Sequence, residues 1–439
     1  MNNFLSTRSR LSFLLAIIAG CLFTGIWILT TQKDWIDSRL FRQLKGVGSG
    51  IGVAGYFLFS LSLFLSSRWS RLEDCFGGLD KIYHIHHQLG IWGFVLILIH
   101  PWVIAAKWIP HRLDKFFTFL FPVHDRWSVN LGSVAFWLMI FIIGVTILKV
   151  FPYDKWKITH QFMSLVFLFA SYHVLFSEKK ISSSLFPHLL LYIPFLMGLF
   201  GVFYKQIFIP LFAKHPLFEV VKTRYLNDNI IEIDLVPREE KLTYIPGQYA
   251  FFRFHGEKLS KESHPFTFTG PPNESKISIL VKSRGDYTRS LYQHVKEGFK
   301  ANLEGPFGRF DFTKTGKEQI WIAGGIGIAP FIAWVRALKF SENDRVIDLF
   351  YSFHRKQDAV FVEEFAQASR TLPHFRYFLF CSEEHNRLNA KEVMDLSNNL
   401  QEKDILMCGP RRLTEDLSRQ LTALGVKRKN ILFEDFEFF

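Results

Sequence analysis

Six long apolar stretches in the first half of the chain limit its possible folds more than any other feature. A helix needs roughly 20 apolar residues to cross a bilayer. The second, third and fifth stretches are short unless their polar flanks are included. From about Phe218 the sequence changes to mixed charged and β-branched residues. A membrane-spanning first half and a soluble second half are therefore predicted. The approximate stretches are Leu11–Leu29, Ile51–Leu65, Leu89–Ala106, Leu131–Phe151, Phe162–Phe176 and Leu185–Phe212.

The first stretch also has features of a signal peptide. Arg8 and Arg10 precede it, and "IAGC" at residues 18–21 resembles a lipoprotein cleavage site. Apolar sequence continues past Cys21 to Leu29, which favours an uncleaved helix. The positive-inside rule does not orient the helices, because Lys and Arg are equally frequent in the two sets of connecting segments.

Charge and cysteine content exclude some classes of protein. The formal net charge of +12 is explained, in a membrane protein, by attraction to anionic lipid headgroups. We therefore expect contact with membrane lipid and no nucleic-acid partner. The four cysteines, Cys21, Cys75, Cys381 and Cys408, lie far apart without a CxxC pair. This spacing excludes the usual thiolate sets for an iron–sulfur cluster or a structural zinc ion.

Two apolar stretches carry histidines at both ends. His86 and His100 are 14 residues apart, which on a helix returns the two imidazoles to within roughly 40° of one face, about 21 Å apart. Ionisable side chains inside a membrane mark functional sites. Neutral imidazole is a good axial ligand of haem, and two such ligands suit the iron to electron transfer. The spacing predicts one haem near each membrane surface.

The second pair, His160 and His173, is 13 residues apart and thus roughly 140° out of phase on an ideal helix. This pair needs tilt or a local distortion to serve both haems. His87 competes with His86, although the spacing to His100 favours His86. The alternative for all these histidines is an interfacial position or hydrogen bonding within the bundle.

The soluble half begins with a pattern typical of an antiparallel barrel. "FEVVKTRYLNDNIIEIDLVP" alternates β-branched residues around a turn at Asn227–Asn229, and "PGQYAFFRF" and "HPFTFTG" follow as strands. "LVKSRGDYTRSL" then predicts a strand running into a helix. Thr288 lies at the expected helix start behind Gly285, where free N–H groups suit a pyrophosphate, and Lys282 adds positive charge. By itself this pattern is a weak signal, because Gly-Asp before a helix is most often plain helix capping.

A second pattern predicts a nucleotide site in an α/β domain. "QIWIAGGIGIAPF" reads as a buried strand followed by Gly324, Gly325 and Gly327, with a helix beginning near Pro330. Further apolar strands, "VIDLFYSF", "HFRYFLFC" and "DILMCGPRRL", alternate with helices, as in a parallel sheet with its ligand at the carboxyl ends. Arg355 is placed to bind a 2′-phosphate, or else is a solvated loop charge.

Together these residues resemble the ferric reductase and NADPH oxidase superfamily, including bacterial transmembrane flavocytochromes b. The resemblance implies a six-helix all-α transmembrane bundle, then a ferredoxin-reductase-like pair formed by an antiparallel β-barrel FAD domain and an α/β nucleotide-binding domain. The expected boundaries are 1–214 for the di-haem membrane domain, 215–313 for the FAD domain and 314–439 for the NAD(P)H domain. "HxxxG" selects His86 with Gly90, so the expected haem ligands are His86, His100, His160 and His173.

The resemblance also implies the nucleotide contacts. "HPFT" resembles the flavin signature of the family, "GDYT" its phosphate contact, and "GPFG", "GGIGIAPF" and "MCGP" follow in the family order. The expected FAD contacts are Gln248, Tyr249, His264, Pro265, Phe266, Thr267, Lys282, Gly285 and Thr288. The expected NADPH contacts are Gly324, Gly325, Gly327, Pro330, Phe331, Arg355, Cys408, Gly409 and Pro410.

Two expectations concern the reacting end of the site. Cys408 is expected near the nicotinamide, and Phe436 is expected over the flavin ring. The family oxidases stop at the position of Phe436, whereas this chain continues through Glu437 to Phe439, so another C-terminal Phe is an alternative stacking residue. The oxidases carry a further histidine one turn beyond the outer haem ligand, and here that position is Ile104.

The implied activity is transmembrane electron transfer. Cytosolic NADPH would reduce FAD, which passes single electrons to the haem of His86 and His160 and then to that of His100 and His173. The expected acceptor is dioxygen, giving superoxide; alternatives are a ferric or cupric chelate, or relay to a membrane or periplasmic protein, and we predict no obligatory protein partner. The expected location is the cell inner membrane, crossed several times, with the FAD/NADPH half in the cytoplasm.

Overall fold

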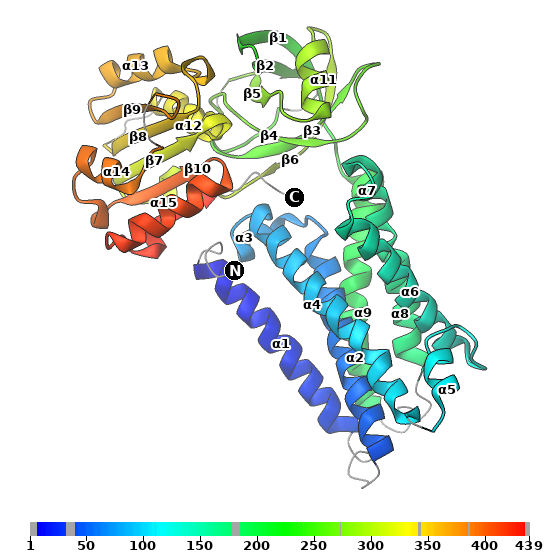
Figure 1. Ribbon diagram of the computed structural model, residues 1–439. Coiled ribbons are helices and arrows are strands. Elements are labelled where there is room, and N and C mark those ends of the chain that lie inside the picture. The colour runs from blue at the N-terminus through cyan, green and yellow to red at the C-terminus, as the bar shows by residue number, and fades with distance from the viewer. Residues whose placement is uncertain are drawn as a thin grey trace. The chain divides into compact units, whose positions relative to one another are not determined.

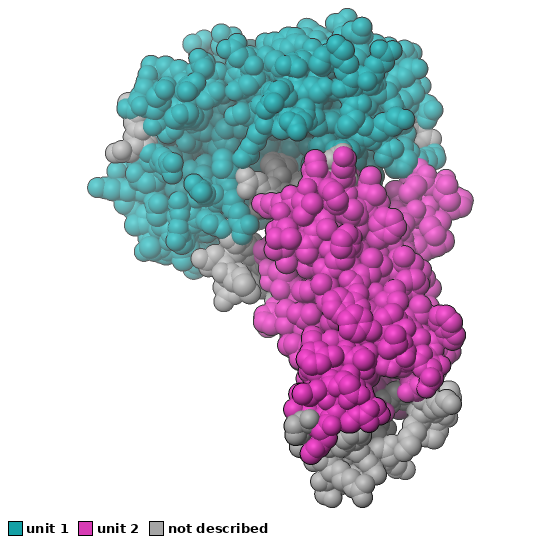
Figure 2. Space-filling model, turned by 45° about the vertical axis from the view of Figure 1, so that its right-hand side comes forward, with its two compact units in different colours: residues 1–8, 73–80, 214–439 teal, residues 9–72, 81–213 magenta. Residues whose placement is uncertain are grey.

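The computed structural model describes residues 7–31, 40–109, 111–177, 185–239, 241–272, 274–340, 344–384 and 387–434. These fall into two compact units (Figures 1 and 2). One unit consists of residues 9–72 and 81–213, and the other of residues 1–8, 73–80 and 214–439.

The described residues before position 214 are almost entirely helical (Figure 1). The helices are α1 (Thr7–Thr31), α2 (Leu40–Leu65), α3 (Ser70–Phe76), α4 (Leu79–Ala105), α5 (Leu113–Thr118), α6 (Trp127–Ile147), α7 (Tyr153–Gln161), α8 (Met163–Phe176), α9 (Leu185–Phe203) and α10 (Ile209–Phe212). A π-helical turn, Tyr204–Phe208, joins the last two.

Five spans among the described residues have the length and composition to cross a membrane. They begin at Leu44, Leu79, Trp127, Lys155 and Leu189. Helix α4 starts ten residues before the predicted stretch, because the helix includes the polar residues around His86. Helix α1 has 25 residues, but its described apolar part, Leu14–Ile28, is shorter than a span. The structure thus shows five candidate spans where the sequence predicted a bundle of six.

The core of the helical unit lies between α2, α6 and α8. Phe167 of α8 is fully buried and stacks on Tyr56 of α2, with ring centroids 5.9 Å apart. Met139 of α6 packs in the same cluster. By contrast, Phe141 and Leu196 are more than half exposed, as expected for faces in contact with lipid.

The chain then forms a six-stranded antiparallel sheet. Its strands are β1 (Leu217–Asn227), β2 (Ile230–Pro237), β3 (Tyr249–His255), β4 (His264–Thr267), β5 (Ile277–Lys282) and β6 (Lys300–Phe307), in the order β4-β3-β6-β1-β2-β5. Phe268, directly after β4, forms an isolated bridge with Ile279 of β5, so the two outer strands meet at one point. The sequence predicted an antiparallel barrel, and the structure shows a six-stranded sheet whose outer strands are bridged at one position. Helix α11 (Asp286–His294) follows β5.

The last part of the chain is a five-stranded parallel sheet with helices on both faces (Figure 1). Helices α12 and α13 pack in one apolar cluster, and α14 and α15 in the other. The strands are β7 (Glu318–Gly324), β8 (Val346–Phe353), β9 (Phe375–Cys381), β10 (Asp404–Cys408) and β11 (Ile431–Glu434), in the order β11-β10-β7-β8-β9. The helices are α12 (Ala329–Leu338), α13 (Val362–Thr371), α14 (Ala390–Leu396) and α15 (Arg411–Ala423).

The two sheets share part of one apolar core. Ile230 of β2 and Leu280 of β5 belong to the same buried cluster as Trp334 of α12. The indole N–H of Trp334 also donates to the carbonyl of Pro246, at 2.9 Å. The antiparallel sheet and the α/β layer are therefore packed together through both apolar and polar contacts.

Candidate functional site

The structure brings the four predicted histidines of the helical unit together in two pairs. His86 of α4 and His160 of α7 have ring centroids 6.5 Å apart. His100 of α4 and His173 of α8 have ring centroids 6.3 Å apart. Two imidazoles that bind one metal ion from opposite sides have centroids about 6.2 Å apart, because each metal–nitrogen bond is about 2.0 Å long. Each pair has the separation that a bis-histidine haem requires.

Hydrogen bonds fix the tautomer of three of these rings. Nδ1 of His86 lies 2.8 Å from the carbonyl oxygen of Ser62, Nδ1 of His100 lies 2.7 Å from that of Gly48, and Nδ1 of His173 lies 2.9 Å from that of Ser128. A carbonyl can only accept, so Nδ1 carries the proton and Nε2 keeps its lone pair. Metal-binding histidines are held in the same way.

Two glycines provide the space that the second pair of rings occupies. A Cβ atom on Gly52 would lie 2.5 Å from Nδ1 of His100, and a Cβ atom on Gly132 would lie 2.5 Å from Nδ1 of His173. Each glycine follows by four residues the one whose carbonyl accepts the imidazole proton, namely Gly48 and Ser128. The two rings are thus seated by the same local arrangement on two helices.

His160 differs from the other three. Its Nδ1 is buried and has no hydrogen-bond partner among the described residues, and its ring stacks on Trp156 at 5.3 Å. The helix is interrupted after it, at Phe162, whose amide donates to the carbonyl of Thr159. This interruption is the local distortion that the 13-residue spacing required. His87 is exposed, so the structure favours His86, as the spacing did.

The predicted flavin residues lie in the antiparallel sheet and in α11. The ring of His264, in β4, stacks on Tyr287 of α11 with centroids 3.8 Å apart. "HPFT" and "GDYT" are therefore in direct contact although more than 20 residues separate them. Burial raises the pKa of Tyr287 to about 12, so its phenol remains protonated at neutral pH.

The register of β3 and β4 places other predicted flavin residues side by side. Tyr249 pairs with Thr267, and both side chains are buried, as is that of Phe266. The side chain of Gln248 forms hydrogen bonds with the backbone. It accepts from the amide of Ile245 at 2.9 Å and donates to the carbonyl of Gly308 at 3.2 Å. Gln248 therefore shapes the site by holding the backbone around it.

The start of α11 has the geometry of a phosphate-binding helix end. Gly285 is the N-cap residue, and the hydroxyl of Thr288 accepts from its amide at 3.1 Å and from the amide of Arg284 at 3.0 Å. The side chain of Thr288 thus fixes the loop before the helix. Lys282 ends the preceding strand, at the same end of α11.

The glycine-rich turn after β7 lies against the end of β10. Residues 325–328 form a 3₁₀ turn, and α12 begins at Ala329 with Pro330 in its first turn. A Cβ atom on Gly327 would lie 2.3 Å from the carbonyl oxygen of Cys408, so only glycine permits this approach. β7 and β10 are adjacent parallel strands, and Gly409 and Pro410 follow directly. The predicted nucleotide residues of the two motifs therefore converge; Phe331 is buried behind them.

Arg355 lies just after β8, at the carboxyl edge of the parallel sheet, and is half exposed. Its Nε is 3.7 Å from Oε1 of Glu383, which follows β9, and the neighbouring Lys356 and Glu384 are 2.8 Å apart. Sequence reasoning had missed these acidic partners, because the pairing depends on β8 and β9 being adjacent. Phe436 lies outside the described residues.

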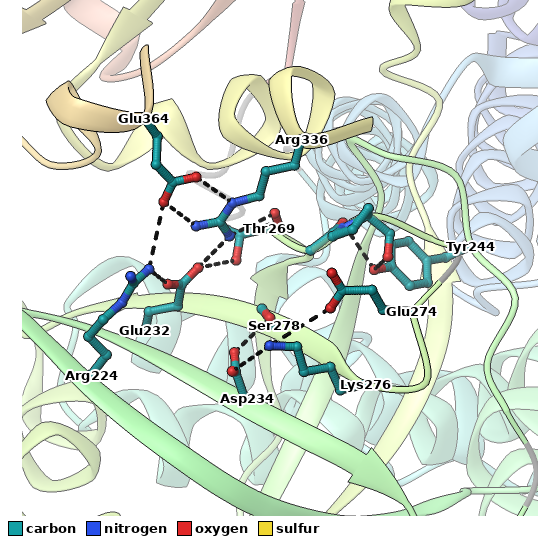
Figure 3. A network of polar contacts seen from close by, with 12 residues as sticks. Arg224, Glu232, Asp234, Tyr244, Thr269, Glu274, Lys276, Ser278, Arg336 and Glu364 are labelled. Atoms are coloured by element: carbon teal, nitrogen blue, oxygen red, sulfur yellow. Dashed lines mark hydrogen bonds and ion pairs between the residues drawn. The ribbon is translucent and has the colours of Figure 1, made fainter. Parts of the chain in front are cut away.

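Sequence reasoning also missed a buried polar network. It is centred on Arg336 of α12, which contacts Glu232 of β2 and Glu364 of α13 (Figure 3). One signal was present in the sequence: Arg336 is the single charged residue of a helix whose other side chains are apolar.

Three family profiles match the chain in order. Residues 51–171 match a ferric reductase like transmembrane component, residues 216–350 an FAD-binding domain, and residues 321–419 an oxidoreductase NAD-binding domain. A curated relative, ferric reduction oxidase 5 of Arabidopsis thaliana, is 25% identical over 321 residues, which are 70% of this chain and 42% of that protein. This domain order fits the ferric reductase-like superfamily.

Other similarities of this ferric reductase-like protein cover its soluble part. The toluate 1,2-dioxygenase electron transfer component of Pseudomonas putida is 23% identical over 227 residues, 49% of this chain and 66% of that protein. The FAD/NAD-binding domain of nitric oxide dioxygenase from Vibrio cholerae has 22% identity and a TM-score of 0.45, covering 50% of this chain and 98% of that domain. The chain thus spans about 42% and 66% of the two curated relatives.

The predictions of a multi-pass membrane protein and of FAD- and NAD(P)H-binding oxidoreductase domains are confirmed by these matches. The chain therefore joins a ferric reductase-like transmembrane component to FAD-binding and NAD-binding oxidoreductase domains in one polypeptide.

Proposed function

We propose that the protein transfers electrons from NADPH through FAD and two bis-histidine haems to an acceptor on the opposite side of the membrane. The two imidazole pairs carry this proposal, because their ring separations of 6.5 and 6.3 Å would allow each pair to hold one iron. A flavin is needed because NADPH gives two electrons as a hydride, whereas haem iron takes one at a time.

The residues of the helical unit hold the two haems and set their electronic environment. His86 and His160 would hold the first haem and His100 and His173 the second, each through Nε2. Hydrogen bonds from Nδ1 to backbone carbonyls make the imidazoles of His86, His100 and His173 stronger donors. About 14 residues of helix separate the two levels, which is about 21 Å along the axis of α4. A membrane-spanning electron path needs such a second centre.

The soluble part binds the donor and the flavin. Thr288 and the first turn of α11 hold the FAD phosphates, and the turn at Gly324–Gly327 admits the nicotinamide dinucleotide close to Cys408. Arg355 holds the 2′-phosphate of NADPH. Since NADPH is cytosolic, this half lies in the cytoplasm and the chain in the inner membrane, an orientation that the Lys and Arg distribution leaves open.

We favour dioxygen as the acceptor, because the "HPFT" motif matches the oxidases of the family. A ferric chelate is the second candidate, because the family match and the Arabidopsis relative both bear ferric reduction in their names. A specific residue also favours the chelate. Ile104, which occupies the place of an additional oxidase histidine, packs beside Gly48, where a glycine Cβ would lie 2.4 Å from its Cγ1.

The test is a reconstituted assay with the full chain. Protein in liposomes receives NADPH on the side of the soluble half, and superoxide and ferrous iron are measured on the other side, together with reduced-minus-oxidised spectra. Superoxide without added chelate supports the oxidase. Activity only with ferric chelate supports the reductase. A folded, FAD-containing preparation without haem bands contradicts the proposal.

A further inference from the structure

A single guanidinium joins the antiparallel sheet to two helices of the α/β layer. Nη1 of Arg336 donates to Oε1 of Glu232 at 2.6 Å and to the carbonyl of Thr269 at 3.1 Å. Glu232 belongs to β2 and Thr269 follows β4, so both acceptors lie in the antiparallel sheet. Nε and Nη2 of Arg336 donate hydrogen bonds to the two carboxylate oxygens of Glu364 in α13, at 3.0 and 2.7 Å (Figure 3). We call these four residues the Arg336 latch.

The Arg336 latch is largely buried and fully engaged. The side chains of Arg336 and Glu232 are 15% and 5% exposed. Thr269 donates its hydroxyl to Glu232 at 3.0 Å, and Arg224 pairs with the other oxygen of that carboxylate. Although burial alone would lower it, the hydrogen bonds to Glu364 and the charge of Glu232 raise the pKa of Arg336. The contact is therefore permanently charged.

The latch borders a cavity of about 330 Å³, whose wall also includes Asp234, Lys276 and Glu274. Asp234 pairs with Lys276 at 2.9 Å, and Glu274 lies 3.8 Å from the same ammonium group. Each of the four carboxylates of the wall thus has a basic partner. None of the predicted flavin or nucleotide residues lines this cavity. Lys222 and Lys339 also line the wall, which therefore carries five basic side chains and four carboxylates. Because the carboxylates are engaged by Arg336, Arg224 and Lys276, we treat the Arg336 latch as a structural contact.

The position of Arg336 in the sequence connects the latch to the reacting groups. Arg336 lies six residues after Pro330, on the helix that directly follows the glycine-rich turn. Thr269 lies two residues after Thr267, the end of the flavin motif. One end of the latch is therefore fixed to the nicotinamide-binding turn and the other to the flavin-binding strand.

We propose that Arg336 is a positioning residue for hydride transfer: it holds the nucleotide-binding helix against the flavin-binding sheet and so sets the distance between nicotinamide and flavin. This inference rests on the proposed function. Hydride transfer requires near-contact geometry, and a displacement of about 1 Å can slow such a step roughly 100-fold.

Arg336→Lys in the full-length protein tests this role. Lysine keeps the charge but cannot bond Glu364 through two nitrogens while also reaching Glu232 and Thr269. We expect anaerobic flavin reduction by saturating NADPH, followed by stopped-flow absorbance, to slow roughly 10- to 100-fold. The isotope effect with 4-deuterated NADPH should rise, and the nicotinamide–flavin charge-transfer band should weaken, while FAD content stays at the wild-type level.

Arg376→Lys is the matched control. Arg376 forms a comparable bond to Asp348, 2.7 Å from Nε to Oδ1, but both residues belong to the parallel sheet. Its flavin-reduction rate should equal that of the wild type. If Arg336→Lys loses FAD, Glu232→Gln is measured instead, because the neutral amide keeps the shape of the side chain and removes the charge that Arg336 and Arg224 share.

The outcomes separate the latch from the proposed function. A wild-type rate and charge-transfer band in a flavin-replete Arg336→Lys or Glu232→Gln protein overturns the latch and leaves the proposed function intact. Wild-type protein whose FAD is reduced by neither NADPH nor NADH overturns the proposed function, and the latch with it.

Discussion

The imidazole of His100 lies against Gly52, so closely that a Cβ atom on this glycine would be 2.5 Å from Nδ1. The carbonyl of Gly48, one turn earlier on α2, accepts the Nδ1 proton at 2.7 Å. The same relationship recurs between His173 and Gly132 on α6, with the carbonyl of Ser128 as acceptor. Glycine therefore leaves the space that each imidazole occupies, and the carbonyl one turn earlier binds its Nδ1.

We predict that Gly52→Ala displaces His100 and removes the second haem. Alanine is a better helix former than glycine by about 1 kcal/mol, so a loss of haem in this variant cannot come from helix propensity. The haem absorbance per protein should fall by roughly half, because one of two bis-histidine sites is lost. Gly144→Ala, on α6, is the control: its added Cβ meets no atom within 4 Å, and haem content should not change. Full haem content in Gly52→Ala would show that the ring tolerates the shift.

We predict that His100→Leu removes the second haem and transmembrane electron transfer, while NADPH still reduces FAD. The reason is that the flavin and nucleotide residues all lie in the other compact unit. Flavin bleaching and haem reduction are followed in the same stopped-flow experiment. His87→Leu is the control, because His87 is exposed and should affect neither. Loss of flavin reduction in His100→Leu would contradict the separation of the two activities.

We predict that Arg355→Ala raises KM for NADPH far more than KM for NADH. Arg355 is the expected partner of the 2′-phosphate, which NADH lacks. Glu383→Gln should lower KM for NADPH. It removes the carboxylate 3.7 Å from Arg355 that a 2′-phosphate would have to displace. Steady-state kinetics with both nucleotides measure the two effects. Arg419→Ala, which breaks an exposed ion pair with Asp416 on α15, is the control. Equal changes for NADPH and NADH would remove Arg355 from the 2′-phosphate site.

We predict that Thr267→Leu lowers FAD occupancy. Thr267 is buried opposite Tyr249, so a larger side chain must displace either the ring or the flavin; overpacking of this kind costs about 1–3 kcal/mol. The absorbance of bound flavin relative to haem gives the occupancy. Thr267→Ser, which keeps the hydroxyl and adds no volume, should retain FAD. A fully loaded Thr267→Leu protein would argue against the assigned contact.

The sequence by itself determined the local elements and the order of the motifs. Apolar length predicted the five candidate spans together with a sixth that the described residues do not confirm. The 14-residue spacing favoured His86 over His87, and "VIDLFYSF" corresponds to β8 as the structure has it. These features depend on periodicity and on residue types within a few turns or one strand, and both can be read directly from a sequence. The spacing of His160 and His173 likewise required a distortion, and the structure has one at Phe162.

Only the tertiary structure decided which distant residues meet. The approach of Gly52 to His100, the pairing of Arg355 with Glu383 and the contacts of Arg336 with Glu232 and Glu364 join positions 28 to 104 residues apart. Each pairing follows from helix packing or strand order, which place side chains together irrespective of their separation along the chain. A charge such as Arg336 in an apolar helix shows that a partner must exist, because burying an unpaired charge is too costly, but the fold selects the partner.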